Sequence, residues 1–501
     1  MPLPKPRADL KPNTAAYETI PLVKATGFRE YDARWILEKE INLLGIQALG
    51  LALGTYAHEI GVKPRIVVGH DFRAYSLGVK QALTVGLLQA GMEVLDIGLA
   101  LSPMAYFAQF DLEAPCVAMV TASHNENGWT GVKMGAQPPL TFGPDEIGRL
   151  KEIVLEGRGV ERPGGTLTQV EGVRERYLKD ITDRVQLSRP IRVIAACGNG
   201  TAGAFAPDAL RAMGAEVVEM DCELDNTFPR YNPNPEDHEM LKAMSERVRE
   251  LGCDVALGFD GDGDRCGVVD DEGEEIFADK IGLMLARDLS ALHPNSTFVV
   301  DVKSTGLYAT DEVLKANGAT TVYWKTGHSY IKRKTAELKA LAGFEKSGHF
   351  FFNDPIGRGY DDGIVAAAAI LAMLDRNPGK TLSDLKKALP VAHTSLTMSP
   401  HCDDETKYGV VADVVAEYEA LAASGGSILG RAIREVITVN GVRVALEDGS
   451  WVLVRASSNK PELVVVVESM RSVEDMRALF HQEVKPRLAK RPEVGAYNQE
   501  I

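Results

Sequence analysis

The sequence lacks several features that mark secreted, zinc-binding or membrane-spanning proteins. Its six cysteines include no C-x-x-C pair and no flanking histidine pair at zinc-finger spacing. Residues 1–7 contain no apolar core of a signal peptide. The most apolar early stretch, residues 41–57, is interrupted by Asn42, Gln47 and three glycines, which predicts a buried amphipathic helix rather than a membrane span. We therefore expect a cytoplasmic protein with reduced, mostly buried thiols and no membrane contact.

Positive charge is also scarce relative to negative charge. The chain carries 55 Lys and Arg against 70 Asp and Glu, a formal net charge of −15. Nucleic acids and anionic membranes select proteins with a basic surface, so we expect neither as a partner. The balance does not exclude a small anionic substrate, because a local cluster of Lys and Arg can outweigh the distant net charge.

The composition supplies the material for several folded domains. A length of 501 residues corresponds to three or four domains of about 150 residues each. With 45% hydrophobic and 25% charged residues, the chain can form several buried cores. Disordered, collagen-like and simple-repeat structures are therefore excluded.

Strand-like and helix-like patterns alternate along most of the chain. Three successive blocks of strand, helix, strand, helix and strand predict three similar α/β domains with mixed, largely parallel sheets. The expected strands cover residues 65–69, 93–97, 116–120, 191–196, 216–220, 254–259, 297–301, 321–324 and 342–345. We expect these three domains over residues 1–170, 171–276 and 277–390.

The remaining residues, 391–501, follow a different pattern. A long helix over residues 405–423 precedes strand-like runs at residues 434–439, 451–454 and 463–467. Asn440-Gly441 is a hairpin turn signal, and Ser472, with Asp475 three residues on, predicts a capped closing helix. This pattern predicts a smaller C-terminal α+β domain.

Ligands of open α/β sheets bind outside the carboxyl ends of the strands, so the residues after each strand are candidates for chemistry. Thr121-Ala-Ser-His-Asn follows the strand that ends at Val120, and Lys133 comes further on. Ser123 could act there as a nucleophile or a phosphoryl carrier beside the titratable His124. It could equally be a turn serine that satisfies backbone groups.

A second loop concentrates negative charge. Gly258-Phe-Asp-Gly-Asp-Gly-Asp-Arg contains Asp260, Asp262 and Asp264 directly after an apolar strand. Three carboxylates so close together are costly unless a cation neutralises them, and the intervening glycines permit a tight turn. An EF-hand would have Gly in place of Arg265 and Glu in place of Asp271. The loop therefore favours a magnesium ion over a solvated acidic turn.

Two further polar loops also follow predicted strands. In Gly343-Phe-Glu-Lys-Ser-Gly-His, Glu345 and Ser347 could bind vicinal sugar hydroxyls. A loop of the C-terminal domain offers groups for a phosphate cradle: Arg455, Ser457, Asn459 and Lys460. A polar surface turn would explain either loop as well.

One glycine pattern indicates another class of protein. Gly198-Asn-Gly-Thr-Ala-Gly follows the strand over residues 191–196, and Glu219 comes further on, which is the form of a dinucleotide-binding fingerprint. It supports an NAD-dependent oxidoreductase as an alternative. However, a strand-to-helix turn needs glycine whether or not a pyrophosphate binds, and no second mononucleotide-binding half follows.

Taken in order, four loops resemble the signature loops of the α-D-phosphohexomutase superfamily: Thr121-Ala-Ser-His-Asn, Asp260-Gly-Asp-Gly-Asp-Arg, Glu345-Lys-Ser-Gly-His and Arg455-Ala-Ser. The segments Asp301-Val-Lys-Ser-Thr and Lys325-Thr-Gly-His-Ser-Tyr-Ile-Lys resemble its phosphomannomutase/phosphoglucomutase branch. The resemblance covers nearly the whole chain. It departs at Glu126, where the family has proline, and at His70-Asp-Phe-Arg.

The resemblance implies four domains arranged around a central cleft, each contributing one loop. It implies an enzyme that interconverts hexose 1-phosphate and 6-phosphate, of mannose and/or glucose, through a 1,6-bisphosphate. Ser123 would carry the phosphoryl group as phosphoserine, and one Mg²⁺ per chain would be held by Ser123, Asp260, Asp262 and Asp264. Glucose or mannose 1,6-bisphosphate would be the activator.

The resemblance also implies a role for each candidate side chain. Ser123, His124, Lys133 and Arg265 would be catalytic, with His124 and Lys133 as acid/base candidates and Arg265 as added positive charge. The sugar hydroxyls and the non-reacting phosphate would be bound by Tyr31, Arg34, Lys303, His328, Glu345, Ser347, Arg455, Ser457 and Asn459.

The combined prediction is an isomerase-class intramolecular phosphotransferase of carbohydrate metabolism, acting on hexose phosphates as a monomer or dimer. A phosphoglucosamine mutase is the nearest alternative, and the NAD-dependent oxidoreductase is the alternative from another class. The presence of all four loops in order argues against the oxidoreductase. A third alternative is an inactive sugar-phosphate sensor, and the retained serine, aspartates and phosphate-loop arginine argue against it.

Overall fold

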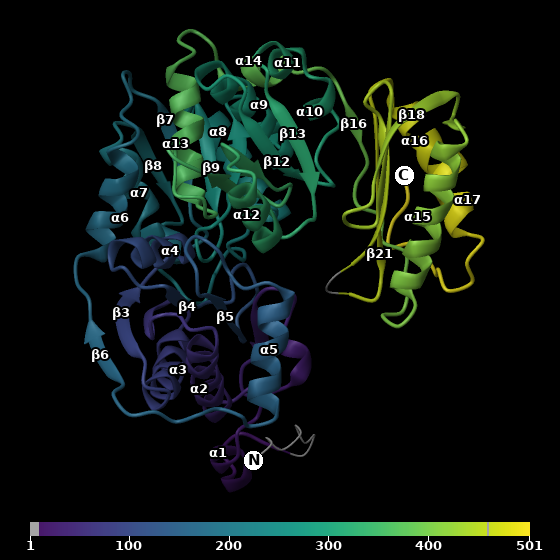
Figure 1. Ribbon diagram of the computed structural model, residues 1–501. Helices are drawn as coiled ribbons and strands as arrows, with labels where there is room; N and C mark the ends of the chain where they lie inside the picture. The colour runs from purple at the N-terminus through teal and green to yellow at the C-terminus, as the bar shows by residue number, and fades with distance from the viewer. Residues whose placement is uncertain (1–9, 458–459) are drawn as a thin grey trace. The chain divides into compact units, whose positions relative to one another are not determined.

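The computed structural model describes residues 10–457 and 460–501. These residues form two compact units (Figure 1). The first unit comprises the chain up to Ile276 together with Ser347–Ser383, and the second comprises Phe277–Lys346 together with Asp384–Ile501. The predicted third domain therefore contributes to both units. Within the described ranges, no helix has the length and apolarity that crossing a bilayer requires.

The first unit begins with a six-stranded mixed sheet. Its strands are β1 Ala33–Ile36, β2 Arg65–His70, β3 Glu93–Leu99, β4 Cys116–Val120, β5 Trp129–Gly135 and β6 Thr166–Gln169. Their order is β1-β5-β4-β2-β3-β6. Strands β4, β2 and β3 run parallel, as predicted. Strand β6, which was not predicted, runs parallel to β3, and β5 pairs antiparallel with β4 and β1. The antiparallel strand β5 sets Lys133 opposite Met119 near the carboxyl end of β4.

Helices pack against this sheet and supply most of its apolar core. They are α1 Ala15–Thr19, η1 Ala25–Gly27, α2 Leu43–Glu59, α3 Ser76–Gln89, α4 Ser102–Asp111 and α5 Pro144–Leu155. Helix α2 begins at Leu43, later than predicted, because the Asn42 side chain accepts a hydrogen bond from Gly45 N at 2.8 Å and caps it. A Cβ at Gly50 would lie 2.1 Å from Leu83 O. Gly50, one of the glycines that interrupt this apolar run, thus lets α2 and α3 approach closely.

The second sheet of the first unit has five strands. They are β7 Arg192–Ala196, β8 Glu216–Met220, β9 Val255–Phe259, β10 Cys266–Asp270 and β11 Glu275–Ile276, in the order β11-β10-β9-β7-β8. Strand β7 runs parallel to β8 and β9, whereas β10 pairs antiparallel with β9 and β11. The three-aspartate loop therefore joins two antiparallel strands, which the sequence pattern did not predict.

Short helices and a second chain segment complete this unit. The helices around the second sheet are α6 Val173–Thr182, η2 Thr201–Ala204, α7 Ala206–Ala212 and α8 His238–Leu251. The segment Ser347–Ser383 adds β15 Phe350–Phe352, α13 Gly363–Asp375 and the first residues of α14 Leu382–Lys387. All six cysteines are buried and free, as predicted.

The second unit contains a parallel sheet and an antiparallel sheet. In the first of these, β12 Thr297–Asp301 lies between β13 Thr320–Trp324 and β14 Ala342–Phe344, and all three are parallel. Its helices are α9 Ala278–Leu292, α10 Leu307–Thr310, α11 Glu312–Ala316 and α12 His328–Glu337. The carboxyl ends of these strands carry Asp301, Trp324 and Phe344, so the polar segments that follow start from one edge.

The antiparallel sheet forms the predicted C-terminal α+β domain. Its strands are β16 His393–Thr394, β17 Ser427–Ile428, β18 Arg431–Ile437, β19 Val442–Leu446, β20 Trp451–Ala456 and β21 Leu463–Ser469, in the order β16-β21-β20-β19-β18-β17. Its helices are α15 Lys407–Ala423, α16 Val473–Ala478, η3 Leu479–Val484 and α17 Lys485–Leu488. Helix α15 packs on one face of the sheet through Val410, Val414 and Tyr418 (Figure 1). The Ser472 cap is confirmed, because its hydroxyl accepts a hydrogen bond from Asp475 N.

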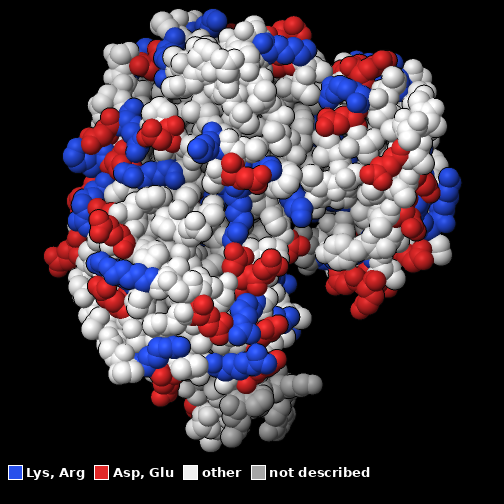
Figure 2. Space-filling view, in the orientation of Figure 1, with Lys and Arg blue, Asp and Glu red and all other residues white. Residues whose placement is uncertain are grey.

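Both signs of charge occur on the face of the molecule shown in Figure 2. Figure 2 shows acidic and basic side chains interspersed over the face in view. The net charge of −15 is therefore not gathered into one acidic patch on that face.

Candidate active site

The Ser123 loop follows β4 and has an unusual backbone conformation. Ser123 is 1% exposed and has a φ of 51°, in the left-handed region that costs a side-chain-bearing residue roughly 1–2 kcal/mol. Two hydrogen bonds hold it there. Ser123 N donates to Thr121 Oγ1 at 2.9 Å, and Arg73 Nη2 donates to Ser123 O at 2.8 Å. The loop is thus tied to the chain on both sides of the serine.

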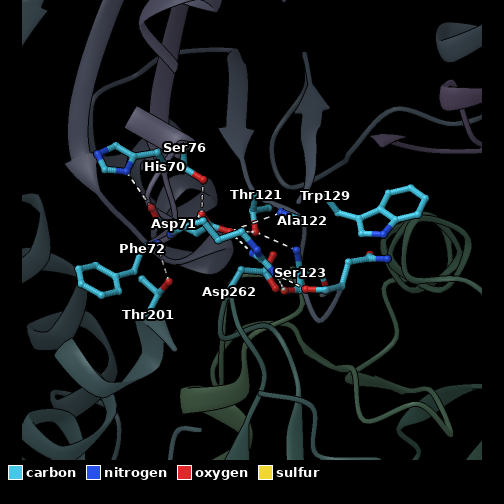
Figure 3. A network of polar contacts seen from close by, with 12 residues as sticks. His70, Asp71, Phe72, Ser76, Thr121, Ala122, Ser123, Trp129, Thr201 and Asp262 are labelled. Carbon is cyan, nitrogen blue, oxygen red and sulfur yellow. Dashed lines mark hydrogen bonds and ion pairs between the residues drawn. The ribbon is translucent and has the colours of Figure 1, made fainter. Parts of the chain in front are cut away.

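Asp71 is the centre of the polar network beneath this loop (Figure 3). It accepts hydrogen bonds from Ser76 Oγ at 2.5 Å and Thr121 Oγ1 at 2.8 Å, and it forms an ion pair with Arg73. Burial alone would raise the pKa of Asp71, but Arg73 and the hydroxyl donors outweigh burial and lower it. Asp71 is therefore a buried carboxylate that fixes the Ser123 loop to the end of β2. No role was predicted for Asp71, although it belongs to the segment His70-Asp-Phe-Arg.

The three aspartates between β9 and β10 form a cluster of buried carboxylates. Asp260, Asp262 and Asp264 are all 0% exposed, and each offers an oxygen within 4.8 Å of the others. Lys133 Nζ lies 2.6 Å from Asp262 Oδ2 and also contacts Asp264. Burial alone would lower the pKa of Lys133, but the two aspartates raise it well above its ordinary value. Lys133 thus partly neutralises the negative charge of this cluster.

The cluster still has capacity for a second cation. Burial, together with Asp262 and Asp264, raises the pKa of Asp260 well above its usual range, which shows how unfavourable the accumulated negative charge is. Asp262 Oδ1 is buried and accepts no hydrogen bond from the described residues. Carboxylate oxygens are the ligands that Mg²⁺ prefers. The loop therefore fits a hard divalent cation.

The serine loop and the aspartate cluster meet at the Ser123 hydroxyl. Ser123 Oγ lies 3.2 Å from Asp260 Oδ2 and 3.2 Å from His124 Nδ1. Arg265 Nε lies 3.8 Å from the same Asp260 oxygen. The charge of Arg265, burial and the charge of Arg34 lower the pKa of His124, so its imidazole is neutral near pH 7. The predicted residues Ser123, His124, Lys133, Arg265 and the three aspartates are thus brought together.

Two of the predicted binding residues also belong to this region of the first unit. Arg34 donates to Asn125 Oδ1 at 2.7 Å and to Asp32 Oδ2 at 2.8 Å, which ties it to the Ser123 loop. Tyr31 is partly buried in the turn before β1. The sequence alone could not assign such contacts, because β1 and the Ser123 loop are far apart along the chain.

Ser347 contacts His349, a residue for which no role was predicted from the sequence. Ser347 Oγ is 3.0 Å from His349 Nδ1, and His349 Nε2 is 3.4 Å from Asp264 Oδ1. His349 therefore links the predicted sugar-binding serine to the aspartate cluster. Asp264, His349 and Asp361 form a second group with metal-ligand spacing. The signal for His349 was present, since it ends the motif Glu345-Lys-Ser-Gly-His.

Lys303, His328 and Glu345 lie at one strand edge of the second unit. Asp301, at the end of β12, accepts from Thr326 Oγ1 at 3.1 Å, and its Oδ2 lies 4.0 Å from Lys303 Nζ. Glu345 Oε1 accepts from Gly327 N at 3.1 Å, directly before His328 at the start of α12. The loops after β12, β13 and β14 are thereby connected to one another.

The predicted phosphate loop follows β20 in the C-terminal domain. Arg455 Nη1 donates to Ala456 O at 3.0 Å, and Ser457 N donates to Glu462 O at 3.0 Å. The buried Lys407 donates to Ser457 O at 2.6 Å and to Lys460 O at 3.0 Å, so it draws the two sides of the loop together. Lys407 was not predicted. The predicted residue Asn459 lies outside the described residues.

The glycines of the NAD-type pattern are explained by packing. Gly198 has a φ of 52°, and a Cβ there would lie 2.9 Å from Pro233 Cα. A Cβ at Gly203 would lie 2.1 Å from Cys222 O. The turn leads into the short helix η2, and Thr201 Oγ1 accepts a hydrogen bond from Phe72 N at 3.0 Å (Figure 3). Protein atoms therefore occupy the space around these glycines.

Comparison with known families covers all four parts of the chain. Residues 25–159, 175–273 and 277–392 match phosphoglucomutase/phosphomannomutase alpha/beta/alpha domains I, II and III. Residues 402–485 match the C-terminal domain of the same family. The chain belongs to the phosphoglucomutase/phosphomannomutase family, and the predicted family resemblance is confirmed.

Individual relatives agree with this assignment. A phosphomannomutase/phosphoglucomutase of Pseudomonas syringae pv. tomato is 33% identical over 93% of this chain and 96% of the relative. One from Pseudomonas aeruginosa is 32% identical over 94% of this chain and 98% of the relative. The crystal structure of a phosphoglucomutase/phosphomannomutase family protein from Burkholderia thailandensis has a TM-score of 0.84 and 27% identity, and covers 95% of this chain and 99% of that one.

Proposed function

We propose that the protein is a phosphohexomutase that interconverts the 1-phosphate and 6-phosphate of mannose and/or glucose. The observation that carries this proposal is the buried Ser123 hydroxyl, 3.2 Å from Asp260 Oδ2 in a three-carboxylate cluster. Membership in a family whose relatives are named for both sugars supports the choice of substrates. It does not support the oxidoreductase alternative.

Ser123 is proposed to carry the phosphoryl group. The free hydroxyl of a bound hexose phosphate attacks the phosphorus, and the bond to Ser123 Oγ breaks as the new O–P bond forms. The resulting 1,6-bisphosphate reverses its orientation and returns its other phosphoryl group to Ser123. Glucose or mannose 1,6-bisphosphate then acts as activator, because it restores phosphoserine on a dephosphorylated chain.

Charged side chains around Ser123 are proposed to support this transfer. His124 Nδ1, 3.2 Å from Ser123 Oγ, and Lys133 exchange the proton of the sugar hydroxyl. Arg265 adds positive charge near the transferring group. Asp260, Asp262, Asp264 and the phosphorylated Ser123 would hold one Mg²⁺ per chain, which would supply charge neutralisation during transfer.

The remaining predicted residues are proposed to bind the substrate. Those proposed to contact sugar hydroxyls or the non-reacting phosphate are Tyr31, Arg34, Lys303, His328, Glu345, Ser347, Arg455, Ser457 and Asn459. We also propose domain boundaries near residues 170, 276 and 390, a cytoplasmic location, and a monomer or dimer as the active form.

The Ser123 proposal is tested by phosphopeptide mass spectrometry and an assay that couples product formation to a dehydrogenase. We expect a phosphoryl group on Ser123 and a loss of at least about 10³-fold in kcat for Ser123→Ala, because the carrier oxygen is removed. Ser188→Ala, an exposed serine of the same unit, is the matched control. Wild-type turnover by Ser123→Ala would contradict the proposal. Faster turnover of glucosamine phosphates than of either hexose phosphate would favour the phosphoglucosamine mutase alternative.

A further inference from the structure

The antiparallel sheet of the second unit has two unlike faces. Val442, Val444 and Val452 belong to the apolar core beneath α15. Because side chains alternate along a strand, Arg443 and Trp451 point to the opposite face. Glu468 pairs with Trp451 across the strands and lies on that face too. Buried polar groups are therefore collected on the side of the sheet that α15 does not cover.

Arg443 uses this face to bind the loop that follows β12. Its Nη1 donates to Val302 O at 2.6 Å and to Ser304 O at 2.7 Å. These two carbonyls belong to the residues on either side of Lys303. One guanidinium therefore holds the peptide group directly before Lys303 and the one after Ser304, and so fixes the backbone segment that carries Lys303, although Arg443 and Lys303 are 140 residues apart in sequence.

Aromatic rings hold the Arg443 guanidinium in place. Its Cζ lies 4.1 Å from the ring centroid of Tyr323 and 3.8 Å from that of Trp451. The Tyr323 hydroxyl donates in turn to Thr305 O at 2.7 Å. Cation–π contacts of this kind are strongest when the cation is desolvated, and Arg443 is only 1% exposed.

Glu468 binds the other end of the same loop. Its Oε1 accepts from Thr305 Oγ1 at 2.9 Å, Gly306 N at 2.7 Å and Trp451 Nε1 at 2.9 Å. Burial alone would raise the pKa of Glu468, but Lys280 and the hydrogen bonds from Thr394, Gly306 and Trp451 hold it at about 2. The carboxylate is therefore charged across the physiological range, and the loop over residues 302–306 is held at both ends.

A purely structural role does not account well for an arginine at this position. Arg443 forms no ion pair at contact distance within the described residues, and burial lowers its pKa although Tyr323, Glu468 and Asp301 act to raise it. A buried guanidinium without a carboxylate partner is costly, and an apolar side chain could fill the same space between two rings. What this arginine supplies, and an apolar side chain would not, is a pair of short hydrogen bonds to the carbonyls of Val302 and Ser304.

We propose that Arg443 is a positioning residue for Lys303, so that the C-terminal sheet shapes a substrate-binding loop of the preceding parallel-sheet region. This inference rests on the proposed function, in which Lys303 contacts the hexose phosphate. Arg443 does not itself touch the substrate. It fixes the backbone from which Lys303 extends, and it thereby reduces the conformational freedom that Lys303 loses on binding.

A double-mutant cycle tests this role. We expect Arg443→Lys to raise KM for glucose 1-phosphate about 5- to 20-fold and to change kcat less than about twofold, because binding rather than transfer is affected. In a Lys303→Ala background the same substitution is expected to change KM less than about twofold, because the side chain that it positions is absent. Equal effects of Arg443→Lys in both backgrounds would overturn the proposal.

Arg431 provides the matched control. It is also an arginine 1% exposed, on the neighbouring strand β18, but it pairs with Asp448 and Asp475 instead of the Lys303 loop. Arg431→Lys is expected to lower the thermal midpoint while its effect on KM stays below about twofold. A KM increase equal to that of Arg443→Lys would mean that loosening the domain, not positioning Lys303, causes the effect.

Hydrogen exchange separates this inference from the proposed function. Faster exchange of the amides of residues 302–306 in Arg443→Lys, and not in Arg431→Lys, supports the positioning role even if wild-type protein fails to turn over hexose phosphates. Unchanged exchange overturns the role whatever the activity. If Arg443→Lys does not fold, Tyr323→Phe removes the hydrogen bond to Thr305 O and keeps the ring, and the same exchange and KM criteria apply to it.

Discussion

Two glycine-rich turns leave neighbouring parallel strands of the same sheet, β7 and β9, at the same edge. Ala196 and Gly258 are paired in the register, so the turn Gly198–Gly203 and the loop Asp260–Arg265 start side by side. They also touch, since Thr201 N donates to Gly261 O at 3.3 Å. From their glycines alone, both the turn after β7 and the loop after β9 would be predicted to bind a ligand.

The two turns differ in what fills the space beside their glycines. At Gly198 and Gly203 that space holds Pro233 and the backbone of Cys222. The β9 loop instead buries three carboxylates, with Lys133 as a countercharge and one Asp262 oxygen without a hydrogen-bond donor in the described chain. Glycine spacing thus indicates close backbone packing, whereas unbalanced buried charge indicates chemistry.

The largest expected effect comes from removing charge from the β9 loop. Asp262→Asn keeps the side-chain shape but removes one carboxylate. We therefore expect kcat to fall about 10³-fold and the Mg²⁺ concentration that gives half-maximal activity to rise at least about tenfold. Initial rates across a Mg²⁺ titration measure both. Unchanged rates with unchanged Mg²⁺ dependence would place the metal site elsewhere.

Adding one methyl group to each turn separates the two roles. A Cβ at Gly261 would lie 2.5 Å from Ser123 O, so Gly261→Ala is expected to displace the serine loop and lower kcat about 10- to 100-fold. Gly198→Ala is expected to cost about 1–2 kcal/mol of stability because of its positive φ, with kcat within about threefold of wild type. Denaturant unfolding and steady-state kinetics measure both variants. The reverse pattern would mean that the Gly198 turn takes part in the chemistry.

The thermal midpoint with and without a ligand tests which of the two turns binds that ligand, and this test does not depend on enzymatic activity. Mg²⁺ at about 100 times its dissociation constant adds roughly 2.7 kcal/mol to the free energy of unfolding, so the thermal midpoint should rise by a few degrees. Chelation by EDTA should reverse the shift, and Asp262→Asn should lack it. NAD at millimolar concentration should leave the midpoint unchanged. A shift with NAD that Gly198→Ala removes would revive the oxidoreductase alternative.

The smallest expected effect concerns Glu219, the acidic residue of the fingerprint. Its side chain is exposed, and among the described residues its ion-pair partner is Arg211. Glu219→Gln is therefore expected to change stability by less than about 0.5 kcal/mol and kcat by less than about twofold. A measurable loss of activity would show that the turn after β7 contributes more than packing.

Much of the fold could be predicted from periodicity, because buried parallel strands are continuous apolar runs. The strands ending at Val120, Phe259 and Asp301 were all recognised in this way. Strands β5 and β10 were missed, because each combines polar residues with glycine. Their antiparallel pairing decides where Lys133 lies and makes the aspartate loop a hairpin.

Site residues could be predicted where they lie close together in the sequence. Three aspartates in one loop indicate a cation without any knowledge of the fold. Asp71, Lys407 and Arg443 each form hydrogen bonds with a loop from another part of the chain. A single charged residue forms no sequence motif whose spacing could predict such a contact. Such residues become visible only when their hydrogen-bond partners are known.

The left-handed conformation of Ser123 lowers the stability of the fold at a position where the proposed activity requires a serine. Glycine adopts a φ of 51° without the steric cost, so Ser123→Gly would relieve strain and stabilise the fold while removing the phosphoryl carrier. Selection for thermal stability alone would therefore favour an inactive protein at this position. Any engineering of a more stable variant must keep Ser123 fixed and look for stability in other parts of the chain.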